Sequence, residues 1–148
     1  MVTRVVVIPC GGAKLGHAAT AGEMYTGSYH RACRRAADRI GGHLLILSAR
    51  YGLLTPSTRI EPYELRMGQP GAVDVATLRT QARALDVDQA DAVVVLAGRR
   101  YADAATAVWP HARRPLDGAG GIGHQLARLA ALTRTGLPYD EDQRSTIQ

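Results

Sequence analysis

The chain has 148 residues, 46% of them hydrophobic and 21% charged, which is ordinary for a globular protein and enough for one domain with a real core. The sequence shows no apolar run long enough to span a membrane and no signal-peptide pattern. Its two cysteines, Cys10 and Cys33, form neither a disulfide framework nor a metal site. We therefore expect a cytoplasmic protein without metal, cofactor or membrane partner. The formal net charge of +5 favours an anionic partner; the alternative is that the arginines only solvate helix faces.

Aliphatic and β-branched runs alternate with helix-length segments from the start of the chain. Residues 4–9 predict a strand that is buried on both faces, because every position is apolar apart from its ends. A helix is predicted over 28–40, with Ser28 as its candidate N-cap, and a second buried strand over 43–48. Residues 49–70 contain three prolines and are predicted to be a long irregular loop, which in a small domain is usually functional.

The second half of the chain continues this alternation. It predicts, in order, a helix over 74–86, a buried strand over 91–97, a helix over 99–108, a short fourth strand over 111–116 and a last helix over 122–134. Strands separated by helices imply parallel crossovers with helices on both faces of the sheet. We therefore expect an α/β fold: a single three-layer domain over residues 1–137 with a small, mostly parallel sheet, followed by a polar tail over 138–148.

Polar segments follow three of the predicted strands, at 9–14, 48–51 and 98–101. The carboxyl ends of parallel strands meet at one edge of the sheet, and this edge is where such sheets bind ligands. The sequence thus predicts one site. The residues expected to line a common pocket there are Lys14, Tyr25, Ser48, Arg50, Tyr51 and Glu64.

The loop after the first strand, Pro9-Cys10-Gly11-Gly12-Ala13-Lys14, contains the only lysine of a chain with seventeen arginines. An ammonium can lose its proton when it is desolvated, whereas a guanidinium cannot, so Lys14 is a candidate phosphate ligand or a candidate catalytic amine. Gly11 and Gly12 expose backbone N–H groups that can form an anion-binding nest. Cys10 is either a nucleophile or a small buried packing residue, and Lys14 could alternatively lie on a solvated loop.

The long loop and the start of the first helix provide the remaining candidates. Glu61 and Glu64 form the one plausible carboxylate acid/base pair, with pairing to arginine within the loop as the structural alternative. Hydroxyls and free N–H groups at a helix start suit a phosphate, tyrosine can stack on a base, and arginine can clamp a phosphate. On these grounds the candidate substrate ligands are Tyr25, Ser28, His30, Ser48, Arg50, Tyr51 and Arg66. The glycine-rich turn 118–123 lies too late in the chain for a nicotinamide-binding fingerprint.

The segments 47–56 and 60–68, with Tyr25-Thr26-Gly27 upstream, resemble the core signature of the YaaA peroxide-stress family. The Pro-Cys-x-x-x-Lys opening, with Ser28 and His30 downstream, resembles a motif of the archaeosine synthase domain, although Leu15-Gly16 stands where that motif has Pro-Tyr. The nearest match is a bacterial family of unknown function that shares both signatures and the late Gly-Ile-Gly-x-Gln-Leu.

This resemblance implies a connection to nucleic acids or nucleobases. YaaA-type proteins are associated with DNA binding and with limiting oxidative damage, and the archaeosine synthase motif with the addition of an amine to a nitrile-bearing base in tRNA. The pocket that carries over from the resemblance comprises Cys10, Lys14, Tyr25, Ser48, Tyr51 and Glu64.

We therefore expect an enzyme that acts on a nucleotide or nucleobase and cleaves or exchanges an N-glycosidic bond. In this reading Glu64 or Glu61 stabilises the sugar cation or activates water, Lys14 and Arg50 hold phosphate, and Tyr51 stacks on the base. One alternative is a non-catalytic stress protein that binds DNA or RNA. Another is amine or thiol chemistry on a modified base, which requires Cys10 and Lys14 to face each other. The expected partner is a nucleotide, nucleoside or nucleic acid, and a homodimer is left open.

Overall fold

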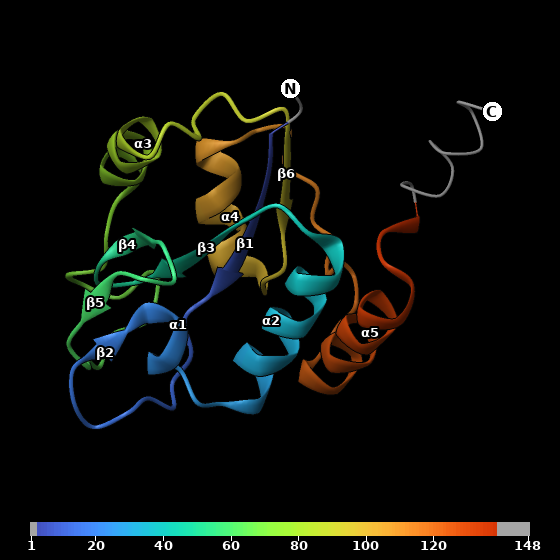
Figure 1. Cartoon of the computed structure of the whole chain (residues 1–148), viewed down its shortest axis with the longest axis horizontal. Coiled ribbons are helices and arrows are strands. Elements are labelled where there is room, and N and C mark those ends of the chain that lie inside the picture. Colours follow the sequence, from blue (N-terminus) through green and yellow to red (C-terminus); the bar gives the residue numbers. More distant parts are fainter. Residues whose placement is uncertain (1–2, 139–148) are drawn as a thin grey trace.

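A computed structural model of the chain describes residues 3–138 and shows a four-stranded sheet in the order β4-β3-β1-β6 (Figure 1). The central strand β1 (Arg4–Pro9) pairs in parallel with β3 (His43–Ser48) on one side and with β6 (Ala92–Val95) on the other. The edge strand β4 (Gly52–Leu54) pairs antiparallel with β3. The predicted α/β domain with a small, mostly parallel sheet is confirmed.

Helices cover both faces of this sheet and give the three layers. On one face α2 (Ser28–Ile40) and α5 (Ile122–Thr135) pack side by side, and on the other α3 (Val75–Ala84) packs against α4 (Arg99–Val108) (Figure 1). Because side chains alternate along a strand, each strand feeds two separate apolar clusters. Both faces of the sheet are therefore dry, as continuous apolar strands require.

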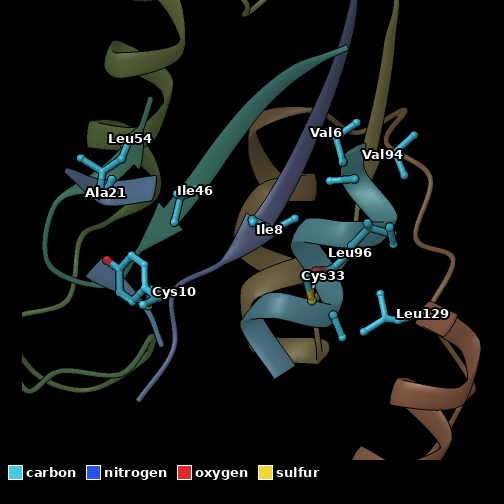
Figure 2. Packing of buried hydrophobic residues seen from close by; sticks show 14 of the residues in the cluster. Val6, Ile8, Cys10, Ala21, Cys33, Ile46, Leu54, Val94, Leu96 and Leu129 are labelled. Atoms are coloured by element: carbon cyan, nitrogen blue, oxygen red, sulfur yellow. Dashed lines mark hydrogen bonds between the residues drawn. The ribbon is translucent and has the colours of Figure 1, made fainter. Parts of the chain in front are cut away.

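β1 shows this alternation most clearly. Val6 and Ile8 join the cluster beneath α2 and α5, while Val5 and Val7 join the cluster beneath α3 and α4. Figure 2 shows the first cluster, in which α2 brings Cys33 against Leu96. The sheet is thus fixed from both sides, and the loops that leave its carboxyl edge start from a rigid base.

The predicted helices and long strands lie within a few residues of their expected bounds, whereas the region 49–70 does not form an irregular loop throughout. It contains β4 and the short strand β5 (Arg59–Ile60), which pairs antiparallel with β2 (Ala19–Thr20), a strand that the sequence did not predict. The one-turn helix α1 (Ala21–Met24) follows β2 directly and was also missed. A hairpin bend after β3, with Gly52 at φ +80°, is what returns the chain along the sheet edge.

Two other local predictions were wrong. The fourth strand expected over 111–116 is reduced to a single parallel bridge between Val94 and Arg113, because Pro110 and Pro115 limit how far the backbone can pair. Ser28 is not the N-cap of α2; Gly27 holds that position, and no side chain caps the helix. Of the predicted tail, residues 139–148 lie outside the described residues. No helix within 3–138 combines the length and apolarity needed to cross a bilayer.

Candidate functional site

A cavity of about 430 Å³ lies at the carboxyl end of β1, where the sequence predicted the site. Three segments build it: the loop after β1, the loop after β5 and the first turn of α4. Its lining residues are Cys10, Gly11, Gly12, Lys14, Glu64, Leu65, Arg66 and Tyr101. Six of these eight were predicted as site residues, and the volume is in the range of small-molecule sites.

Lys14 is held at this cavity by backbone pairing and by aromatic rings. It forms an isolated antiparallel bridge with Tyr25, and its Nζ lies 4.5 Å from the ring centroid of Tyr63 and 5.9 Å from that of Tyr25. The ammonium donates to the Gly12 carbonyl at 3.4 Å. Among residues 3–138 no carboxylate forms a salt bridge with Lys14, so this half-buried cation has no counter-ion of its own.

Backbone donors lie next to this cation. Within the described part of the chain, no protein group accepts the N–H groups of Gly11 and Gly12. Neither glycine adopts the left-handed backbone region, and the loop exposes both N–H donors. A cation and two free N–H groups on one wall make the cavity suited to an anionic ligand.

A hydrogen-bonded chain of hydroxyls lies under Lys14. The Ser48 hydroxyl donates to the Tyr63 hydroxyl at 2.7 Å, and the Tyr63 hydroxyl is 2.7 Å from that of Tyr25. Ser48 Oγ also accepts the backbone N–H groups of Arg50 at 3.2 Å and Tyr51 at 3.0 Å, so it caps the turn after β3. This network ties the ends of three segments together beneath the cavity floor.

Burial keeps these phenols protonated. Desolvation raises the pKa of Tyr25 to about 12, and it also raises the pKa of Tyr63. A phenol that stays neutral at physiological pH acts as a hydrogen-bond donor and acceptor, not as an anion. The rings beneath Lys14 are therefore neutral and do not cancel the charge of its ammonium group, which can still bind an anionic ligand.

The thiol of Cys10 lines the same cavity, next to this network, where it interacts with Tyr63. Its Sγ is 3.3 Å from the Tyr101 hydroxyl, whose oxygen also accepts the Met67 N–H at 3.3 Å. Because the Met67 N–H occupies one lone pair of Tyr101, the phenol proton remains free to point at the sulfur. Burial raises the pKa of Tyr101, so that proton stays in place near neutral pH.

The remaining predicted ligands are spread around this cavity. Tyr25 and Ser48 lie beneath it, in the hydroxyl network, and Tyr51 packs edge-on against Tyr63 with centroids 5.6 Å apart. Arg50 is exposed and stacks over the outer face of Tyr51 at 5.7 Å. The structure thus brings Lys14 and Glu64 into one cavity. Tyr25, Ser48 and Tyr51 lie behind this cavity, and all three contact Tyr63.

Three predicted residues lie elsewhere. Glu61 is exposed, and its backbone carbonyl and N–H bond the Tyr51 hydroxyl, so its carboxylate takes no part in the cavity lining. Ser28 lines a different cavity, between α2 and α5. His30 is buried behind Tyr25, where its Nδ1 bonds the Pro9 carbonyl at 2.9 Å and burial lowers its pKa. Its role is to support the loop after β1.

Two central residues were not selected from the sequence. Tyr63 lies within the Pro-Tyr of the long loop and is 8% exposed, and Tyr101 follows Arg99-Arg100 in the first turn of α4. The feature of the sequence that could have identified both is that each is an aromatic residue in a segment that follows a strand. No group of three or more His, Cys, Asp and Glu side chains within 3–138 could hold a metal ion.

The site and the sheet together define a compact α/β protein with a cavity, lined by Lys14 and Glu64, at the carboxyl edge of its parallel strands. Residues 5–131 match the profile of DUF6884, a family of unknown function, and the chain belongs to this family. It is also similar to the uncharacterized protein YfjM of Bacillus subtilis strain 168, with 29% identity over 138 residues, covering 85% of this chain and 92% of YfjM.

Proposed function

We propose that this protein is an enzyme that acts on a nucleotide or nucleobase in the cavity after β1 and cleaves or exchanges an N-glycosidic bond. The observation that supports this most is that the same cavity of about 430 Å³ is lined by Glu64, which bears a carboxylate, and by Lys14, a half-buried cation that forms no salt bridge among residues 3–138. A reaction of this kind develops positive charge on the sugar and negative charge on the leaving base. It needs one group of each sign in one place.

The proposed roles follow from the position of each group. Lys14, the N–H groups of Gly11 and Gly12, and Arg66 hold a phosphate. Glu64 stabilises the sugar cation or activates water. Tyr101 stacks on the base in this proposal. The sequence predicts this role for Tyr51, but Tyr101 lines the cavity and Tyr51 does not.

The likeness to the YaaA and archaeosine synthase signatures belongs to this proposal. In the synthase motif a tyrosine follows the lysine closely, whereas here ten residues separate Lys14 from Tyr25. The backbone bridge between the two brings them side by side nevertheless. A cytoplasmic location is also part of the proposal, and it fits the two free thiols, Cys10 and Cys33.

A second candidate function, amine or thiol chemistry on a modified base, is favoured by one observation. It requires Cys10 and Lys14 to share a pocket, and both line this cavity. Tyr101 would hold the sulfur in place for attack on an electrophilic carbon. This candidate predicts a covalent adduct on the protein, which glycosidic cleavage through Glu64 does not require.

The test is incubation with a panel of nucleosides and nucleotides, followed by mass-spectrometric detection of free base and of protein adducts. Release of a free base by the wild type, reduced about 10²- to 10⁴-fold in Glu64→Gln, supports glycosidic cleavage. Glu61→Gln is the matched control, because Glu61 lies in the same loop outside the cavity, and it should retain activity.

Other outcomes discriminate between the alternatives. An adduct that disappears in Cys10→Ala or Lys14→Ala would favour the second candidate. Absence of both base release and adducts across the panel, together with salt-dependent binding of DNA, would refute the enzyme and favour a binding protein.

A further inference from the structure

The layer formed by α2 and α5 carries an excess of positive charge. Its two helices contain six arginines and a single carboxylate, Asp38. Asp38 is already engaged, because its Oδ1 lies 3.6 Å from Arg34 Nε. Arg128 is also occupied, since it donates to the carbonyls of Pro115 and Asp117. Four arginines of this layer form no ion pair or hydrogen bond among residues 3–138: Arg31, Arg35, Arg39 and Arg134.

Three of these arginines form one stripe along α2. Arg31, Arg35 and Arg39 are spaced four residues apart, and all three are exposed. With a rise of 1.5 Å per residue, successive guanidinium groups are anchored roughly 6 Å apart along the helix. Such a row can contact successive phosphates of one nucleic acid strand, and the planar guanidinium binds phosphate through two parallel hydrogen bonds.

A groove runs beside this stripe. The space between α2 and α5, which lie side by side (Figure 1), holds a cavity of about 370 Å³. Its apolar lining comes from Ala32, Leu126 and Ala130, and Arg35 and Arg134 flank it from the two helices. The groove therefore combines an apolar floor for a sugar or base with cations on both sides.

We propose that this α2–α5 surface binds the phosphodiester backbone of a nucleic acid. The partner is named from its chemistry: a regular row of exposed arginines matches a regular row of anions, and an apolar groove flanked by cations suits a polymer with both phosphates and flat apolar groups. The proposal goes beyond the reaction proposed for the cavity and does not depend on it. It concerns a different surface, formed by two helices and not by the loops after the strands.

The experiment measures fluorescence anisotropy of labelled 20-nucleotide DNA and RNA, single- and double-stranded, between 50 and 200 mM KCl. The test variant is R31Q/R35Q/R39Q. Its matched control is R59Q/R79Q/R83Q, which removes the same charge from three exposed arginines of β5 and α3. Losing three phosphate contacts should lower the slope of log Kd against log salt by about 2 for a single strand and weaken binding more than tenfold, whereas the control should change binding less than threefold.

Several results would overturn the proposal. They are no binding of any oligonucleotide by the wild type at 50 mM KCl, equal losses in the test and control variants, or displacement of the oligonucleotide by poly-glutamate at equal charge concentration. The last result would assign the surface to an acidic polypeptide. R31K/R35K/R39K should retain part of the affinity because it keeps the charge but loses the paired hydrogen bonds. The base-release assay tests the reaction proposed for the cavity independently of oligonucleotide binding. Either proposal can therefore be refuted without affecting the other.

Discussion

Replacing Tyr63 with phenylalanine should lower the free energy of unfolding by about 2 kcal/mol, because it leaves two buried hydroxyls without their partner. Tyr63 accepts the Ser48 proton at 2.7 Å and bonds the Tyr25 hydroxyl at 2.7 Å, and Ser48 and Tyr25 are 0% and 3% exposed, so water cannot replace the lost partner. For a chain of this size the loss corresponds to about 4–8 °C in Tm.

Urea unfolding is the assay, followed through the single tryptophan, Trp109, which is fully buried. Tyr51→Phe is the matched control, since its hydroxyl makes only long contacts, of 3.3 and 3.4 Å, with the backbone of Glu61, and it should cost less than about 0.5 kcal/mol. Tyr63→Phe keeps the aromatic ring under Lys14. The folded variant should therefore still bind a ligand in the cavity.

A double-mutant cycle measures the coupling between Ser48 and Tyr63. Ser48→Ala and Tyr63→Phe remove opposite ends of one hydrogen bond, so the double variant should be about 1 kcal/mol more stable than the sum of the two single losses predicts. Strict additivity, or a Tyr63→Phe protein as stable as the wild type, would show that the hydroxyl network contributes nothing to stability.

Lys14→Ala should weaken capture of a phosphate-bearing ligand by about tenfold to a hundredfold in calorimetry, while Lys14→Arg should keep part of it; equal loss in both would instead indicate an amine that must be deprotonated. Gly52→Ala should lower the free energy of unfolding by more than about 2 kcal/mol in urea, because Gly52 has a φ of +80° and a Cβ there would overlap the Gln81 carboxamide; Gly12→Ala, which meets nothing within 4 Å, is the control. Burial lowers the pKa of His30, so the unfolded chain binds its proton more readily: the stability from His30 is complete above the unfolded pKa of 6.5 and is lost as pH falls below it. Unfolding at pH 7.5 and 5.5 should show this loss, and a pH dependence unchanged in His30→Gln would contradict it.

The central sheet was predictable because its strands are buried on both faces, which forces continuous apolar runs such as Val5–Ile8 into the sequence. Strands of two residues, such as β2 and β5, leave no such pattern, and their pairing depends on the path of the chain between them. Local pattern therefore reveals the elements that make the core but not the small ladder that shapes the loops around it.

The same distinction applies to the cavity. Cys10, Lys14 and Glu64 could be found because they lie in loops that follow strands or in the long proline-rich segment. Tyr63 and Tyr101 could not be ranked, because a tyrosine near a proline or at a helix start has no periodic pattern that shows whether it is buried. The sequence predicts His30 to be a substrate ligand, whereas the rotation of α2 turns its ring toward the Pro9 carbonyl.

The position of β1 at the centre of the sheet has a consequence for synthesis on the ribosome. β1 is made before the other strands of the sheet, yet its partner β6 follows it by more than eighty residues, which takes roughly 4–17 seconds at ordinary translation rates. During that interval the run Val5-Val6-Val7-Ile8 has no complete sheet to join and is a segment prone to aggregation. Arg4 and Pro9 flank the run directly, one with a charge and the other without an N–H to donate, so the nascent strand carries its own gatekeepers at both ends.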